Sequence, residues 1–366
     1  MSDGTSIEWA HATWTIAGGC TRCSPGCDNC YAATFVHRGL HPTHRGLTKL
    51  RPKSANRPGV DWNGNVRTLA DRLADPIKWR KPRRVFVGSM TDLFHPVIPF
   101  GYIAAVFGVM AATPRHTYLV LTKRPERALE FFAWLERESK DEHPALGRDA
   151  LVCLCCDLAK LYRLDPGADV PLTWPLPNVH MGCSVEDQQY ADERIPALLE
   201  CPAALHWISA EPLLGPVDLA KYLPERATLG FVGPELRAKG YTEGPILLSR
   251  GPKLGHVIVG GESGSGARPF DVAWARAIIQ QCQAAQVPAF CKQLGSRPVE
   301  WRTALSRVQL NLNDAKGGAR AEWPLARGGE HRRSAHFVPA RGLPGRPRHG
   351  PRVGRGDPLE RPPHRA

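Results

Sequence analysis

Six short apolar runs separated by helical patterns constrain the fold of this chain more than any other feature. Each run is continuously apolar and does not alternate with polar residues, as expected for strands covered on both faces of a parallel sheet. Between the runs, apolar residues recur at three and four spacing, as at Ala273, Ala277 and Ile278. The runs span residues 83–90, 116–124, 178–185, 205–212, 256–263 and 287–295.

Strand and helix therefore alternate along the chain, with one further extended segment expected before the cysteine-rich loop that begins near residue 18. This gives six or seven βα units and predicts an α/β fold, most simply a full or partial (β/α) TIM-like barrel of parallel strands. A doubly wound open sheet is the nearest alternative. Helices are expected over residues 66–75, 100–112, 125–139, 186–200 and 271–285.

Two regions interrupt this alternation. Residues 222–255 are rich in Gly and Pro and are expected to form an insertion, with room for a small hairpin. Residues 301–366 contain fourteen Lys and Arg against five acidic residues, so this tail accounts for +9 of the net charge of +13. We predict a barrel domain over 1–300 and a basic Arg/Pro/Gly-rich tail over 301–366 that is disordered from about residue 325.

The cysteine count and hydropathy bear on where the protein resides. Eleven cysteines are an odd number for a disulfide framework, and no basic and apolar leader opens the sequence, so we expect a reducing, cytoplasmic environment. No apolar run approaches the roughly 20 residues that cross a bilayer, so no membrane association is expected.

Polar residues follow every predicted strand, where parallel barrels carry their chemistry. Such residues also cap helices, so each one taken singly is weak evidence of a site. If the strands form as predicted, one ring collects Ser89, Thr91, Asp92, Thr122, Lys123, Arg124, Ser184, Glu186, Ser209, Glu211, Gly260, Gly261, Glu262, Ser263, Lys292 and Gln293.

Two acidic and two basic members of this ring stand out as candidate ligand-binding residues. Glu211 precedes a proline, and Glu262 lies within a Gly-rich stretch. In both places a carboxylate at a strand end is poorly placed to cap a helix. Lys123 and Arg124 suit a carboxylate or phosphate, although a solvated helix start would have the same composition.

The glycine-rich stretch GGESGSG, residues 260–266, matches no standard nucleotide-binding motif. Gly260 and Gly261 nevertheless imply that some other group approaches the backbone closely at this strand end.

Four cysteines, Cys20, Cys23, Cys27 and Cys30, fall within eleven consecutive positions. Buried structural cysteines rarely cluster so densely, which indicates a metal site. Four-cysteine zinc sites usually draw two pairs from well-separated positions, whereas here three residues separate the pairs. Iron-sulfur clusters accept denser spacing because their irons lie close together. The spacing therefore favours an iron-sulfur cluster over zinc.

Several stretches together resemble one known family. It is a phage-associated family of unknown function whose members share a three-cysteine motif, and it is similar in fold to the radical S-adenosylmethionine superfamily. The resemblance covers about residues 5–297 and does not extend into the tail. It is carried by IEWAHATWTIAGGCTRCSPGCDNCYA (7–32), FVGSMTDLFH (86–95), LTKRP (121–125), SAEPLLGPV (209–217), GGESGSGARP (260–269) and CQAAQVPAFCKQLG (282–295).

The resemblance leaves open which three cysteines bind iron. The family pattern C-x6-C-x2-C maps onto Cys20, Cys27 and Cys30, whereas the superfamily spacing C-x3-C-x2-C maps onto Cys23, Cys27 and Cys30. The aromatic residue that often precedes the last cysteine in the superfamily is Asn29 here.

The superfamily resemblance implies a [4Fe-4S] cluster with one open iron that binds S-adenosylmethionine, an electron donor, and a 5′-deoxyadenosyl radical that abstracts hydrogen from a substrate. It implies that Lys123 or Arg124 meets the cofactor carboxylate and that Glu211 or Glu262 meets its amine or ribose. A GGE motif holds the amine after the second strand in the superfamily. Glu262 follows the sixth predicted strand, so that role is not transferred to it.

Two functions are the main hypotheses, beside a third possibility, an electron-transfer cluster that requires both Cys20 and Cys23. The first is a radical S-adenosylmethionine enzyme acting on an unknown substrate, with a nucleotide or nucleic-acid target suggested by the phage association of the family. The second is a non-catalytic, metal- or cluster-stabilised protein that binds nucleic acid through its basic tail. The first 300 residues carry a net charge of only +4, which weakens the second hypothesis.

Overall fold

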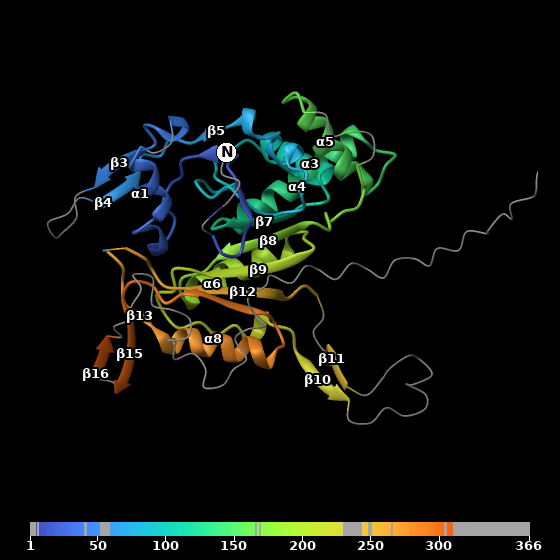
Figure 1. Cartoon of the computed structure of the whole chain (residues 1–366). Helices are drawn as coiled ribbons and strands as arrows, with labels where there is room; N and C mark the ends of the chain where they lie inside the picture. The colour runs from blue at the N-terminus through green and yellow to red at the C-terminus, as the bar shows by residue number, and fades with distance from the viewer. Residues whose placement is uncertain are drawn as a thin grey trace, which may run out of the picture.

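The computed structural model describes residues 5, 7–39, 42–51, 59–164, 167, 170–229, 244–247, 251–264, 266–303 and 306–309. Seven parallel strands form one sheet that curls into an open half-barrel (Figure 1). Each strand pairs with the next member of the sheet in chain order. The strands are β1 (Ala12–Trp14), β6 (Arg84–Val87), β7 (Thr117–Thr122), β8 (Val179–Ser184), β9 (Leu205–Ala210), β12 (Leu254–Gly260) and β14 (Ala289–Gln293).

The prediction of a parallel α/β sheet is confirmed, in its partial-barrel form. All six apolar runs contain a strand, and β1 is the further strand expected before the cysteine loop. The sheet has β1 and β14 at its two edges, so the barrel is not closed. A doubly wound sheet reverses its strand order near the middle. This sheet does not, so the doubly wound alternative is wrong.

The inner face of the half-barrel is filled at the amino-terminal ends of the strands by Trp9. Its ring lies 4.7 Å from the ring of Phe86 and 5.5 Å from that of Trp207, both in edge contact. The segment is held there because Arg84, the first residue of β6, donates from Nε to the Trp9 carbonyl. Gly182 leaves room for the Trp207 ring, which a Cβ would approach to 2.4 Å. The carboxyl ends therefore remain as the place for a site.

Four of the five predicted helices are confirmed, and each packs its apolar stripe against the sheet or a neighbouring helix. A further helix, which the sequence analysis did not predict, lies against α3, where Gly108 lets the backbone of Cys155 come close. The helices are α3 (Phe100–Ala112), α4 (Pro125–Glu142), α6 (Gln188–Glu200), α8 (Val272–Ala284) and the additional α5 (Asp149–Lys160).

The helix predicted over residues 66–75 is wrong. That segment contains β5 (Arg67–Thr68), a 3-10 turn at Ala70–Arg72 and the first residue of α2 (Asp75–Lys78). The helical spacing of Leu69 and Leu73 arises because both bury their side chains against the main core from a turn. Tertiary hydrogen bonds hold the turn, since the Trp14 indole donates to the Arg72 carbonyl over 2.8 Å.

Smaller sheets flank the half-barrel. The hairpin expected in the insertion 222–255 is present as β10 with β11. The strands β15 and β16 continue past residue 300, and the tail predicted to be disordered from about residue 325 lies outside the described residues. The remaining elements are β2 (Ala17–Gly18) paired with β5, α1 (Tyr31–His37), the hairpin β3 (Thr48–Arg51) with β4 (Gly59–Trp62), β10 (Arg226–Leu229) with β11 (Gly244–Leu247), and the sheet of β13 (Phe270–Asp271), β15 (Pro298–Thr303) and β16 (Ser306–Gln309).

Within the described part of the chain, no helix is both long enough and apolar enough to cross a membrane.

Three buried histidines make the fold sensitive to mild acid. Burial lowers the pKa of His95 and His180 to about 4 and that of His256 to about 3, and nearby Arg124 adds to the effect at His95. In the unfolded chain these side chains have a pKa of about 6.5. The unfolded state therefore binds more protons between pH 6.5 and about 4, and stability falls as the pH falls through that window.

We expect the midpoint of urea unfolding to drop between pH 7 and pH 5. The free energy of unfolding should fall by up to about 4 kcal/mol per pH unit once all three histidines take up a proton in the unfolded state. His256→Gln should reduce this slope by up to about 1.4 kcal/mol per pH unit, the contribution of one proton, whereas His37→Gln, a change at an exposed histidine, should leave it unchanged. A midpoint that stays constant from pH 7 to pH 5 would contradict this account.

Candidate functional site

The four clustered cysteines lie on one loop that runs from β2 to α1. The loop contains a 3-10 turn at Pro25–Cys27 and passes into α1 directly after Cys30. All four thiols are free; Cys23 is exposed and the other three are partly buried. At the start of the loop, Gly19 has a φ of +93°, and a Cβ there would lie 2.1 Å from the Asn65 carbonyl oxygen. Only glycine fits this turn.

The four thiols differ in their electrostatic environment. A hydrogen bond from Cys23 lowers the pKa of Cys27 to about 4, and nearby Lys123 acts in the same direction. Burial raises the pKa of Cys20 to about 12, and burial also raises the pKa of Cys30. Of the four thiols, Cys27 is therefore the one whose surroundings most favour the thiolate.

A fully buried carboxylate, Glu186, lies beneath the middle of the loop just after β8. Ser24 donates a hydrogen bond of 2.8 Å to its Oε1, and Lys123 forms an ion pair with the same oxygen. Arg194, from α6, donates to Oε2 over 2.9 Å. Gly26 lies directly above, where a Cβ would come within 2.4 Å of Oε1. The carboxylate thus ties the loop to β7, β8 and α6.

Arg124 ties the first half of the loop to the ends of β6 and β7. Its guanidinium donates to Asp92 Oδ2 and to the Thr21 carbonyl, each over 2.9 Å, and its Nη1 lies 3.9 Å from the Cys20 sulfur. Asp92 is itself held by the Thr122 hydroxyl at 2.7 Å. Planar guanidinium groups suit such divided contacts because their donors point in fixed directions.

Glu262 ties the second half of the loop to the segment after β12. Its Oε2 accepts hydrogen bonds of 3.0 Å from both Arg268 Nε and Asn29 Nδ2. Arg268 also donates to the Pro25 carbonyl over 2.9 Å. Burial by itself would raise the pKa of Glu262, but the hydrogen bonds from Arg268 and Asn29 outweigh it and lower that pKa.

Glu211, at the end of β9, has fewer partners than the other two carboxylates. Lys292 Nζ lies 3.1 Å from its Oε1, and the Ser209 hydroxyl donates to its Oε2 over 3.2 Å. Gly260 and Gly261, which the sequence analysis singled out, leave room for other groups of the protein and not for a ligand. A Cβ on Gly260 would lie 2.3 Å from the Glu211 carboxylate, and one on Gly261 would lie 2.6 Å from the backbone that follows β14.

The structure therefore brings the predicted strand-end residues to one edge of the sheet and places the cysteine loop against them. Each of Lys123, Arg124, Glu211 and Glu262 has a partner inside the protein. Sequence reasoning missed the roles of four residues that complete these contacts. These residues are Ser24, Asn29, Arg194 and Arg268. Only for Arg194 did the sequence offer a signal, because this charged residue interrupts the apolar stripe of α6.

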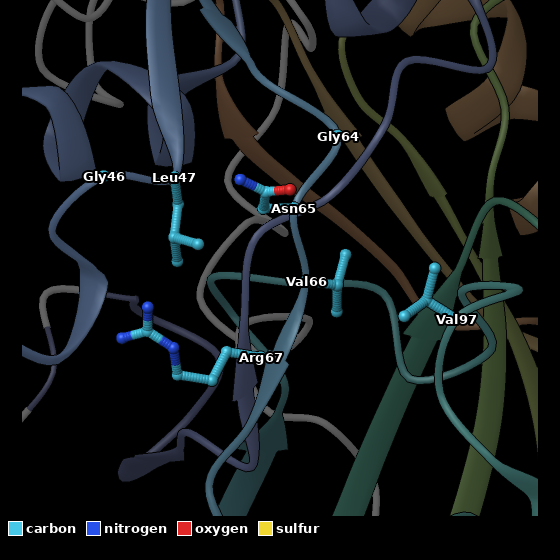
Figure 2. A pocket seen from close by; sticks show the side chains of 7 residues that line it. All are labelled: Gly46, Leu47, Gly64, Asn65, Val66, Arg67 and Val97. Carbon is cyan, nitrogen blue, oxygen red and sulfur yellow. The ribbon is translucent and has the colours of Figure 1, made fainter.

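A cavity of about 390 Å³ lies beside the start of the loop, where its lining residue Asn65 meets Gly19 (Figure 2). None of the predicted site residues lines it, and Arg67 is its one charged lining residue. Among the described residues, no three His, Cys, Asp or Glu side chains converge closely enough to hold a single metal ion. The cavity is lined by Gly46, Leu47, Gly64, Asn65, Val66, Arg67 and Val97.

We expect Glu186→Gln to destabilise the protein by about 3–5 kcal/mol, because Lys123 and Arg194 would be left buried without a negative partner. Urea unfolding at pH 7 measures the change. Glu193→Gln, which removes an exposed carboxylate from the same helix, serves as the control and should shift stability by less than about 0.5 kcal/mol. Equal effects of the two substitutions would show that Glu186 does not tie the loop down.

Comparison with known proteins places this site in a family. Neither the comparison with curated proteins nor that with solved structures finds a match. A family described as "Protein of unknown function (DUF5131)" matches residues 4–324, a range that includes the cysteine loop and every strand of the half-barrel. The chain therefore belongs to the DUF5131 family.

Proposed function

We propose that this protein is an iron-sulfur enzyme of the radical S-adenosylmethionine type, with a [4Fe-4S] cluster on the cysteine loop. The observation that carries the proposal is the position of that loop. It lies at the carboxyl edge of a parallel half-barrel, where such folds carry their chemistry, and it presents four reduced thiols there. The resemblance to the phage-associated family supports the same function and favours a nucleotide or nucleic-acid substrate.

The thiols of the loop fit a cluster better than a single ion. In a cluster each thiolate binds a different iron, so the ligands stand further apart than those around one metal ion. Cys20, Cys27 and Cys30 are partly buried, whereas Cys23 is exposed. This difference in burial and the C-x6-C-x2-C pattern of the family support Cys20, Cys27 and Cys30 as the ligands.

On this proposal, Cys23 is the spare thiol. It is exposed and forms a hydrogen bond with Cys27, so the two sulfurs are in contact. The ligand set of this proposal follows the wider C-x6-C-x2-C pattern, and Cys23 lies outside that set.

Two cations adjust the charge around the loop. A cluster bound by thiolates is anionic, and hydrogen bonds to its sulfurs alter its reduction potential. Arg124 reaches towards the Cys20 sulfur, and the positive charge of Lys123 acts on Cys27. Their carboxylate partners fix both side chains, so they serve the loop more directly than they serve a cofactor carboxylate.

When bound, the cluster and S-adenosylmethionine together supply a 5′-deoxyadenosyl radical from one donated electron. The chain itself orients and shields these groups. Glu186 and Arg124 hold the loop in place, and Trp9 packs with Phe86 and Trp207 on the inner face of the half-barrel. Among the described ion pairs at the strand ends, Glu211 and Lys292 have few further partners, with the Ser209 hydroxyl as a hydrogen-bond donor to Glu211, and we assign the pair to the cofactor's amine and carboxylate.

The first test is anaerobic iron and sulfide analysis with electron paramagnetic resonance of the reduced protein, before and after adding S-adenosylmethionine. We expect about four irons per chain and a signal that shifts when the cofactor binds the open iron. Cys23→Ala should keep both properties, and Cys20→Ala should lose them. Iron-free protein with bound zinc, or a signal that ignores the cofactor, would rule out this function.

Deletion of residues 325–366 separates this function from the alternative of a nucleic-acid-binding protein that uses its tail. The cofactor-dependent shift should survive the deletion, because the cysteine loop and its contacts lie within residues 18–292. Loss of that shift in a folded truncated protein would contradict the proposal.

A further inference from the structure

The helix α1 and the β3–β4 hairpin form a small unit beside the cysteine loop. They share a core of their own, in which two helix residues, Ala33 and Val36, pack with Leu47 and Trp62. We call the described residues from 31 to 68 the α1–hairpin unit. In Figure 1 it lies on the left, the side on which the carboxyl ends of the strands also lie. The Tyr31 hydroxyl donates to the Ser89 carbonyl over 3.2 Å, which joins the unit to the end of β6.

The unit is more positively charged than the net charge of residues 1–300 suggests. Across residues 31–68 the sequence has seven Lys and Arg and one acidic residue, Asp61. Since residues 1–300 are net +4, the rest of that region is net −2. Asp61 already lies 3.5 Å from Arg22, so it does little to offset the unit's charge. The described and exposed cations of the unit are Arg38, Arg45, Lys49 and Arg67.

The same unit exposes aromatic side chains. Tyr31 is 56 % exposed and Phe35 is 41 % exposed, and their spacing of four residues puts them on one face of α1. Neither ring belongs to the core of the unit, which the helix contacts through its other face, although the Tyr31 hydroxyl itself is held by the Ser89 carbonyl. Aromatic side chains beside basic residues are the combination on which single-stranded nucleic acids stack their bases.

We propose that the α1–hairpin unit binds single-stranded nucleic acid. Its cations contact the phosphates, and bases stack on Tyr31 and Phe35, as on other surfaces that combine a basic patch with exposed aromatics. A duplex keeps its base faces stacked inside the helix, so it would leave both rings without a partner. An acidic peptide would satisfy the charges but not the rings.

If the α1–hairpin unit binds single-stranded nucleic acid, this is also the substrate class of the neighbouring site. Tyr31 directly follows Cys30, so a base stacked there lies next to the cysteine loop. Only the fate of the bound strand rests on the proposed radical chemistry. Strand binding itself needs no cluster, so failure of the one proposal is distinguishable from failure of the other.

The test is fluorescence anisotropy of a labelled 20-nucleotide oligothymidylate with the full-length protein, titrated at several salt concentrations. Phe35→Ala should weaken binding about ten-fold through loss of one stacked base. Arg38→Gln combined with Lys49→Gln should reduce the salt slope by about 1.4, the value for two lost phosphate contacts on a single strand. Circular dichroism confirms that each variant is folded.

The matched control removes the same charge from a distant surface. Arg137→Gln combined with Lys140→Gln acts on exposed residues of α4 and should leave the affinity for the oligonucleotide close to that of the parent protein. Deletion of residues 325–366 should leave the effect of Phe35→Ala intact.

Three results would overturn the assignment. Control and unit variants that weaken binding equally would show a response to overall charge alone. Abolition of binding by the tail deletion would place the interaction on the tail. Tighter binding of a duplex of the same length would show that the exposed rings do not stack on bases. In each case the cluster signal and its response to S-adenosylmethionine would remain as the separate test of the proposed chemistry.

Discussion

One buried carboxylate organises the site. Glu186 lies beneath the cysteine loop and joins it to two cations, Lys123 and Arg194, that come from different elements of the half-barrel. A carboxylate with no exposure is unstable in a protein unless charged partners compensate for the lost water. The loop therefore has its position because the sheet supplies those partners, and Gly26 has no side chain because the carboxylate occupies that space.

Two further ion pairs hold the loop in the same way. Arg124 with Asp92 holds the start of the loop, and Glu262 with Arg268 holds its end. The charged residues at the strand ends thus serve first to fix the loop in the protein. This ordering matters for the proposed chemistry, because a cluster on a loop that moved would lose both its shielding from water and its alignment with a substrate.

The two ends of the half-barrel differ in the side chains that they carry. Trp9 fills the amino-terminal end with aromatic contacts, whereas the carboxyl end remains polar and carries the cysteines. The α1–hairpin unit then adds a basic and aromatic surface beside that polar end. The net charge of residues 1–300 does not reveal the positive charge of this unit, because the remainder of that region is slightly acidic.

Much of the fold was predictable from local pattern. Continuous apolar runs determined the parallel strands and thus the edge at which Asp92, Glu186 and Glu262 meet, because strand direction follows from the alternation with helices. The segment 66–75 was not predictable, since tertiary hydrogen bonds to the β1 region override its helical spacing. The sequence by itself also determined the cysteine cluster. Only the tertiary structure decided which side chains fasten it, because Arg194 and Arg268 lie far from it along the chain and reach it through folding alone.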